Sequence, residues 1–344
     1  GESDAASSVP GKVDTVLPMP DLKGQTITIN TYGGSYAEAL NKAVVAPFEK
    51  ATGAKVDLVT TCCNNFSTTV EKGQYAGDIV LGNDYGPMLE WAAAGLLKSD
   101  DRLVQIAETR GVENGFYQDD LIAANFYAYV LGWNTNRVQQ PPASWEDFFN
   151  TEKFTGKRGL FNLPGVMYEA SLLGQGVPAA GLYPLDEDKA LAGIEKLRQA
   201  GVLRTWNDGA ELTNKLGTGE FDYAIGFSNR LVQAKEQGVP VDFTFNGAFR
   251  VASGAAIPVN AKNVDGAVAF LDFYLQPEVQ AAFAELSAMA PAYSAANEQL
   301  KADVAAAMVT SAQNIGKTVK YDDAYWSTNF EDHLKRYTAF LSGN

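Results

Sequence analysis

The spacing of apolar residues changes near residue 32 from a period of two to a helical period. Over 26–31 the isoleucines alternate with polar residues, and every residue except Asn30 is β-branched, which predicts a strand. Leu40, Val44 and Phe48 then recur every four residues, as on one face of a helix. Between the two patterns lies the run TYGGSY, in which Ser35 is the expected helix cap. The turn either presents backbone N–H groups to a ligand or serves only packing.

The same unit recurs in the first third of the chain. The apolar runs 56–60 and 78–82 are typical of buried strands, and polar or glycine residues and then helical spacing follow each run. These units predict an open, largely parallel α/β sheet, whose ligands bind at the carboxyl ends of the strands. At that edge we expect one rim formed by Tyr32, Gly33, Ser35, Asn83, Asp84 and Tyr85.

A second α/β pattern begins after residue 136. Ser144 is the expected cap of a helix, a strand should end at Asn162, and further strands are expected at 201–207 and 221–227. The last helix should carry an apolar packing stripe that includes Trp326.

Length and composition suit two domains, since 344 residues with 46% hydrophobic content can bury two cores. The formal net charge of −14 argues against nucleic acid and anionic membrane surfaces as partners, because both require a basic footprint. No apolar run is long enough to cross a membrane, so we expect a soluble chain, already processed if it is exported. Residues 1–23 are expected to form a flexible leader.

Residues that carry common enzyme chemistry are scarce. The only histidine, His333, is far in sequence from any glycine-rich turn, and the G-x-S-x-G, P-loop and G-x-G-x-x-G motifs are missing. The two cysteines, Cys62 and Cys63, are too close together for a metal site and form either a strained vicinal disulfide or two partly buried thiols. We therefore expect no enzyme, cofactor or metal. A hydrolase with two carboxylates and a ferric-ion receptor with clustered tyrosines are weaker alternatives.

Seven segments carry a resemblance that covers nearly the whole chain from Gly24 onward. They are FEKATGAKV, GDIVLGNDYGPMLEWAAAGLL, LGWNTNRV, PASWEDFFNTEKFTGKRGLFN, GTGEFDYAIGFSNR, AIPVNAKNVDGAVAFLDFYLQPEVQAAF and YWSTNFEDHLKRY. In this order they resemble the spermidine/putrescine-type extracellular solute-binding proteins of bacterial ABC importers. The resemblance implies a two-lobe α/β periplasmic-binding-protein fold. Each lobe would be a mixed, mostly parallel sheet flanked by helices, and the lobes would close at a hinge on a small molecule.

The resemblance also implies how the chain divides into lobes, where the protein is located and what it binds. Lobe 1 would comprise 24–130 plus 253–300, and lobe 2 would comprise 131–252 plus 301–344. The implied location is periplasmic, with the signal peptide absent from this chain. The implied partners are a small-molecule ligand and the permease of an ABC importer in the inner membrane, and we expect a monomer.

Three acidic positions that the resemblance implies for polyamine binding hold other residues here. They correspond to Asn162, Gly165 and, within one residue of register, Ala252 or Ser253. A buried polyammonium ligand without carboxylates would leave its charges desolvated and unpaired. We therefore expect a polyamine to be a poor ligand, and a spermidine or putrescine receptor is the alternative hypothesis.

The residues near the predicted strand ends favour a different ligand. Arg204, Arg230 and Arg250 offer guanidinium groups that can bind a carboxylate or phosphonate through two parallel hydrogen bonds. Trp206 and Phe227 can line a site for an alkyl chain or an ammonium group. Any of these residues could instead form a surface ion pair or belong to a core. We expect a receptor for a carboxylate- or phosphonate-bearing amine such as an ω-amino acid.

Three further residues bear on this prediction. Ser253 is the last residue of the predicted site, and Phe249 is the aromatic residue that best fits a core instead. Glu169, a candidate ammonium partner together with the rim residue Asp84, lies inside a predicted helix and is expected to face solvent.

Overall fold

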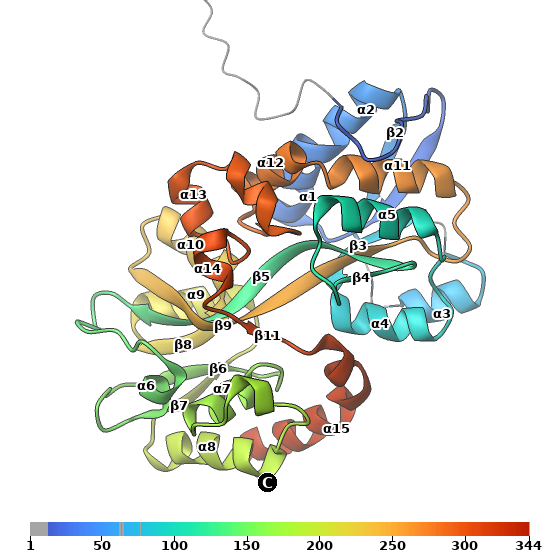
Figure 1. Ribbon diagram of the computed structural model, residues 1–344. Helices are drawn as coiled ribbons and strands as arrows, with labels where there is room; N and C mark the ends of the chain where they lie inside the picture. Colours follow the sequence, from blue (N-terminus) through green and yellow to red (C-terminus); the bar gives the residue numbers. More distant parts are fainter. Residues whose placement is uncertain (1–12, 62, 64, 76, 344) are drawn as a thin grey trace, which may run out of the picture. The chain divides into compact units, whose positions relative to one another are not determined.

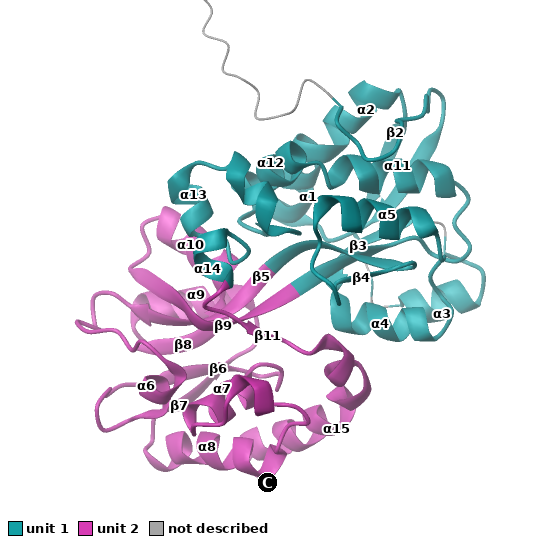
Figure 2. Cartoon of the chain, viewed as in Figure 1, with its two compact units in different colours: residues 1–126, 252–315 teal, residues 127–251, 316–344 magenta. Residues whose placement is uncertain are grey.

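The computed structural model describes residues 13–61, 63, 65–75 and 77–343. The chain divides into two compact units (Figure 2): unit 1 comprises 1–126 and 252–315, and unit 2 comprises 127–251 and 316–344. The chain passes between the units within strands β5 (Leu121–Asn134) and β9 (Val241–Ala256) and after helix α14 (Ala312–Ile315). The division expected from the sequence placed this third passage at 300/301.

Unit 1 contains the predicted parallel strands (Figure 1). Strand β1 (Thr26–Asn30) is parallel to both β2 (Lys55–Val59) and β3 (Ile79–Asp84). The unit 1 part of β9 pairs antiparallel with β3, and two short strands, β4 (Tyr117–Gln118) and β10 (Ala290–Pro291), pair antiparallel with β5. The sheet is therefore mixed, and the predicted fold class is confirmed.

Helices surround this sheet. They are α1 (Gly34–Leu40), the π-helical η1 (Asn41–Val45), α2 (Ala46–Thr52), α3 (Phe66–Glu71), α4 (Tyr85–Ala93), α5 (Asp101–Arg110), α11 (Val264–Tyr274), α12 (Pro277–Ser287), η3 (Ser294–Gln299), α13 (Ala302–Ala306) and α14. Helix α12 packs on α1, and α11 packs on α5. The ring of Phe48, on the predicted apolar stripe, is fully buried edge-on against Phe270 at 5.1 Å between centroids. Burial of this stripe anchors the first helix to the core.

The first helix begins one residue before the predicted cap. Gly33 occupies the N-cap position without a side-chain hydrogen bond, and α1 starts at Gly34, whose φ of +63° suits glycine. The prediction that Ser35 caps the helix is therefore wrong, and Ser35 lies exposed in the first turn. The helical path ends at Gly53, as its pattern indicates.

Residues 13–23 pack on the rest of unit 1. The backbone N–H groups of Val16 and Leu17 donate to the two carboxylate oxygens of Asp272, at 2.9 and 2.8 Å, and Leu22 is buried. These hydrogen bonds satisfy a carboxylate that is itself buried. The prediction of a flexible leader over 1–23 is therefore wrong for 13–23, and residues 1–12 lie outside the described residues.

The strands of unit 2 also pair in both parallel and antiparallel directions. Strand β6 (Arg158–Phe161) is parallel to β7 (Leu203–Trp206) and to β8 (Tyr223–Phe227), and β5 pairs antiparallel with β8. The short strand β11 (Val319–Lys320) pairs parallel with the unit 2 part of β9. Strands β6, β7 and β8 are the three predicted from the sequence.

The helices of unit 2 are α6 (Trp145–Phe149), α7 (Met167–Gly174), η2 (Ala179–Gly181), α8 (Glu187–Gln199), α9 (Gly209–Thr218), α10 (Ser228–Glu236) and α15 (Asp323–Leu341). Ser144 caps α6 as predicted, because its Oγ accepts a hydrogen bond from the Asp147 backbone N–H at 3.1 Å. Helix α15 packs on α8, and burial of Trp326 and Tyr337 confirms that α15 is a packing helix. Within the described ranges, no helix has the length and hydropathy needed to cross a membrane.

Candidate ligand-binding site

The rim predicted for unit 1 forms at the carboxyl ends of β1 and β3. Because these strands are parallel neighbours, Tyr32 and Asn83 lie close together, and the Tyr32 hydroxyl donates to Asn83 Oδ1 at 2.5 Å. The Tyr32 side chain is 40% exposed, and Asp84 is also exposed. Burial, together with the charge of Asp84, raises the pKa of Tyr32 to about 12. Tyr32 is therefore a neutral phenol on an accessible edge.

A glycine in β3 allows this arrangement. Gly82 has a φ of +101°, and a Cβ at this position would lie 3.1 Å from the Tyr36 hydroxyl and 3.3 Å from the Tyr32 ring. The two aromatic rings therefore lie against the backbone of β3. A side chain at residue 82 would displace Tyr32 from the rim.

Two of the predicted unit 1 residues are buried. Tyr85 is 1% exposed, and its ring packs edge-on against Phe116 at 6.1 Å between centroids, in the core of the unit. Ser253 is 3% exposed and pairs with Asp84 in the β3–β9 register. The accessible part of the predicted rim therefore consists of Tyr32, Gly33, Ser35, Asn83 and Asp84.

Unit 2 carries an aromatic cluster at the carboxyl ends of β6, β7 and β8. Trp206 stacks on Phe161, with centroids 4.2 Å apart and an angle of 10° between the rings. Phe227 meets Trp206 and Phe161 edge-on, at 5.0 and 5.3 Å. Tyr127 and Tyr129 of β5 also contact Phe227, at 5.7 and 5.1 Å. The structure therefore brings the predicted Trp206 and Phe227 together, and we call these five residues the aromatic cluster.

Three members of the aromatic cluster were not predicted. Tyr127 and Tyr129 are two residues apart in β5, so their side chains lie on the same face of the strand. Phe161 directly precedes Asn162 at the end of a predicted strand. The period of two and the strand end were the signals that could have identified them. The buried Trp206 Nε1 has no hydrogen-bond partner within the described part of the chain.

Asn162 and Gly165 occupy the two positions of unit 2 where the resemblance implies acidic residues. Both lie close to other polar side chains. The Asn162 Nδ2 donates to Asn207 Oδ1 at 3.0 Å, and Asn207 in turn donates to the carboxylate of Glu211. At Gly165, a Cβ would lie 2.7 Å from the Tyr321 hydroxyl. An acidic side chain at residue 165 would therefore collide with Tyr321 where the structure places it.

Two of the three predicted arginines are engaged elsewhere. Arg204 is exposed and donates to the carbonyl oxygens of Gly201 and Leu203, at the amino end of β7 and away from the aromatic cluster. Arg250 is only 8% exposed, and its Nε donates to Thr318 Oγ1 at 2.9 Å. Neither guanidinium group is presented to solvent at the edge that carries the aromatic cluster.

Arg230 is the predicted arginine that lies at the same edge as the aromatic cluster. It is exposed in the first turn of α10, which directly follows β8. Its side chain runs beside Gly209 at the start of α9, where a Cβ would lie 2.6 Å from the Arg230 Nε. Within the described part of the chain, Arg230 makes no hydrogen bond or ion pair, and its guanidinium can therefore bind a carboxylate without first losing a partner.

Two further predictions are settled by burial. Phe249 is fully buried and is a core residue, as its pattern indicated. The prediction that Glu169 faces solvent is wrong, since its side chain is completely buried at the start of α7. Three hydrogen-bond donors, the hydroxyl of Tyr183, the indole Nε1 of Trp326 and the backbone N–H of Val166, surround its carboxylate and make this burial feasible.

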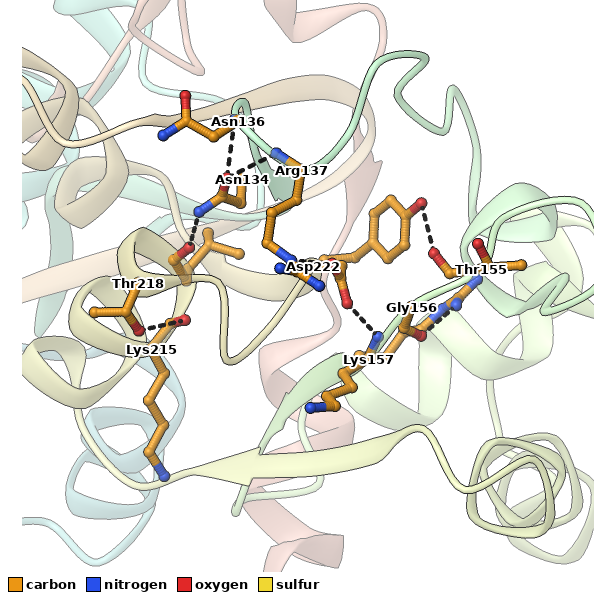
Figure 3. Close-up of polar contacts among 12 residues, drawn as sticks. Asn134, Asn136, Arg137, Thr155, Gly156, Lys157, Lys215, Thr218 and Asp222 are labelled. Atoms are coloured by element: carbon orange, nitrogen blue, oxygen red, sulfur yellow. Dashed lines mark hydrogen bonds and ion pairs between the residues drawn. The ribbon is translucent and has the colours of Figure 1, made fainter.

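The opposite edge of the unit 2 sheet carries a closed polar network (Figure 3). Asp222 accepts hydrogen bonds from Arg137 Nε and from the Lys157 backbone N–H, both at 2.7 Å. Asn134 Oδ1 accepts the backbone N–H groups of Asn136 and Arg137. Both carboxylate oxygens of Asp222 are therefore used, and this network joins the amino ends of β6 and β8.

His333 and Cys63, which were considered for enzyme or metal chemistry, contact or bond to other side chains of the protein. His333 Nδ1 lies 2.6 Å from a carboxylate oxygen of Glu187, and His333 Nε2 lies 2.7 Å from the Tyr325 hydroxyl. Cys63 is disulfide-bonded, and Cys62 lies outside the described residues. No group of three or more histidine, cysteine or acidic side chains suited to a metal ion occurs among the residues that the structure describes.

Three known proteins to which this chain is similar belong to one class, the solute-binding proteins. Residues 43–310 match the family model for bacterial extracellular solute-binding proteins. The gamma-aminobutyric acid-binding protein of Pseudomonas aeruginosa is 24% identical over 329 residues, which cover 93% of this chain and 92% of that protein. A solved ABC transporter substrate-binding protein from Bradyrhizobium japonicum USDA 110 has a TM-score of 0.84 and 27% identity, over 92% of this chain and 100% of that one. The PBP MotA from A. tumefaciens B6, solved with glucopine, has a TM-score of 0.77 and 27% identity, over 91% and 99%.

The chain belongs to the bacterial extracellular solute-binding protein family. It is the substrate-binding receptor of an ABC transporter, an exported protein whose partners are a small-molecule ligand and a membrane permease. Proteins of this family bind solutes and are not enzymes. The resemblance found in the sequence is confirmed at the level of the family, whereas its spermidine/putrescine type is not.

Proposed function

We propose that this receptor captures a small amine that carries a carboxylate, with γ-aminobutyrate as the first candidate. The observation that carries the proposal is the edge of unit 2 at which Arg230 and the aromatic cluster occur together. The related gamma-aminobutyric acid-binding protein supports the same ligand class. A phosphonate-bearing amine would meet the same chemistry.

Each end of such a ligand has a suitable partner. The guanidinium of Arg230 can donate two parallel hydrogen bonds to a carboxylate, which gives both strength and orientation. The π faces of the aromatic cluster can receive the methylene chain and the ammonium group. The unpartnered Trp206 Nε1 is a further donor. At the rim of unit 1, the exposed carboxylate of Asp84 offers a second type of ammonium contact.

A polyamine receptor is the weaker hypothesis. Asn162 and Gly165 supply no negative charge to a second ammonium group, and Tyr321 occupies the space beside residue 165. A second cationic end would instead lie near the guanidinium of Arg230, which would repel it.

The test compares two four-carbon ligands that share one ammonium end. Isothermal titration calorimetry and thermal unfolding are measured with γ-aminobutyrate and with putrescine, which replaces the carboxylate by a second aminomethyl group. We expect γ-aminobutyrate to bind and to raise the melting temperature, since a ligand at 100 times its Kd stabilises the folded state by about 2.7 kcal/mol. Putrescine should give no shift at millimolar concentration. Micromolar binding of putrescine or spermidine without binding of γ-aminobutyrate would overturn the proposal.

We also propose that the receptor works as a monomer that binds no nucleic acid, and that strands β5 and β9 carry the hinge between its two units. Support for the monomer comes only from the family pattern, and the net charge of −14 speaks against nucleic acid. Multi-angle light scattering of the purified protein at 36.9 kDa per chain would test the oligomeric state. A mass equal to that of a stable dimer would overturn the proposal that the receptor is a monomer.

A further inference from the structure

Glu169 is a buried carboxylate without a cationic partner in the described part of the chain. Its Oε1 accepts the Val166 backbone N–H at 3.0 Å. Its Oε2 accepts both the Tyr183 hydroxyl and the Trp326 Nε1–H at 2.8 Å. Burying a carboxylate is strongly unfavourable unless hydrogen bonds satisfy it, and an apolar residue would fill the same space at less cost. The three donors therefore indicate that the Glu169 carboxylate has a role that an apolar residue could not fulfil.

The hydrogen bond to Val166 holds an unusual backbone conformation. Val166 has a φ of +71°, which is strained for a β-branched residue. It is the last residue before α7 and ends the segment 161–166, which begins at the last residue of β6. Strain of this kind persists only where surrounding contacts enforce it, and the Glu169 carboxylate binds the N–H group of the strained residue itself.

Helix α15 fixes the other end of the same segment. The Tyr337 hydroxyl donates to the carbonyl oxygen of Phe161 at 2.6 Å, and the Phe161 N–H donates to Met167 Sδ at 3.4 Å. Trp326, one of the three donors to Glu169, belongs to the same helix. Helix α15, which runs along α8 (Figure 1), thus holds Phe161 directly and Val166 through Glu169.

We propose that Glu169 is a positioning residue for ligand binding. Together with Trp326 and Tyr183 it holds the segment 161–166, and with it Phe161 of the aromatic cluster and Asn162, in the geometry that receives the ligand. The inference rests on the proposed function only in assigning this edge of unit 2 to the ligand. Glu169 does not touch the ligand in this role and acts through the backbone of Val166.

We expect Glu169 to hold the segment only when its carboxylate is ionised. Burial raises the pKa of Glu169 to about 7, although the hydrogen bonds from Trp326 and Tyr183 oppose the shift. All three neighbours donate, so a proton on either oxygen must displace a donor or remain without an acceptor. The titratable groups that face Glu169 or lie next to it are Tyr183, Tyr321, Tyr325, Asp322, Asp323 and, one step further, His333 with Glu187. Affinity should therefore fall as the pH falls through about 7.

The first experiment needs no ligand. Hydrogen–deuterium exchange of the apo protein at pH 8 is compared for wild type, Glu169→Gln and the control Glu195→Gln, whose side chain lies on α8 and pairs with Arg198. Glutamine keeps the size of Glu169 but cannot accept on both sides, so exchange of the 161–166 amides should rise about tenfold or more, with β7 unchanged. Unchanged exchange in 161–166 would overturn the proposal. Should Glu169→Gln not fold, Trp326→Phe removes one donor and keeps a ring.

The second experiment is a pH profile of the Kd for γ-aminobutyrate between pH 5.5 and 8.5. Wild type should lose affinity below about pH 7, and Glu169→Gln should bind more weakly with a flat profile. His333→Gln should keep the wild-type slope, because His333 contacts Glu187 and Tyr325 and makes no hydrogen bond to Glu169. A flat wild-type profile, or a slope lost in His333→Gln, would overturn the proposal. If wild type does not bind γ-aminobutyrate, the proposed function fails while the exchange result still decides the role of Glu169.

Discussion

Replacing Arg230 by glutamine should weaken the binding of γ-aminobutyrate without unfolding the receptor. A hydrogen bond to a charged group contributes about 1.5–3 kcal/mol, so loss of a two-bond contact to a carboxylate should cost about 2–4 kcal/mol, or about 30- to 1000-fold in Kd. The exposed Arg230 makes no bond to the described residues, so the free energy of unfolding of the apo protein should change by only about 0.5 kcal/mol or less.

Two further variants sharpen this test. Arg230→Lys keeps the charge but not the planar pair of donors, so its Kd should lie between those of wild type and Arg230→Gln. Arg204→Gln is the matched control, because Arg204 bonds only to local carbonyl oxygens at the other end of β7. Titration calorimetry gives the Kd values, and thermal unfolding of the apo proteins gives stability. If Arg230→Gln binds within about twofold of wild type, or if Arg204→Gln is the variant that loses affinity, the reasoning about this edge is refuted.

Three other outcomes can be measured on the same samples. Tyr32→Ala should weaken binding by about 1–3 kcal/mol with little loss of apo stability, whereas a core role would cost about 3 kcal/mol of stability and leave the Kd unchanged. If ligand closes the two units, as the family resemblance implies, small-angle scattering at saturation should show a smaller radius of gyration, and an equal radius would exclude closure. Because burial raises the pKa of Glu169 from near 4.5 to about 7, the stability of wild type relative to Glu169→Gln should decrease as the pH rises through this window, opposite in sign to the affinity.

Much of the fold could be predicted because local patterns determined it. The alternation over 26–31 and the apolar runs at 56–60 and 78–82 became parallel neighbours, since strands joined by helices pair in parallel. Ser144 capped a helix because its hydroxyl competes well for a backbone N–H at a helix start. The error at Ser35 arose because Gly34 can enter the helix with a positive φ, so a glycine replaced the expected serine cap.

The candidate site could be predicted only where strand ends determine position. Tyr32 and Asn83 met because their strands are neighbours, and Trp206 and Phe227 met because β7 and β8 are both parallel neighbours of β6. The arginines could not be ranked, because the direction of a long flexible side chain depends on the partners it finds. Arg204 bonds to carbonyl oxygens beside it, whereas Arg230 has no partner among the residues that the structure describes.

Glu169 shows why a polar residue in a helix is difficult to place from sequence. An acid with apolar neighbours usually faces solvent, because burial of its charge is unfavourable. Here the partners that reverse this preference come from distant segments, Tyr183 from a loop and Trp326 from the last helix, and no local spacing reveals them. Glu169 binds donors from two remote elements and the N–H of a strained residue at the end of the segment 161–166. It therefore links the C-terminal helix to the edge proposed to bind the ligand. That link explains why α15, which carries no predicted ligand contact, should nevertheless affect affinity.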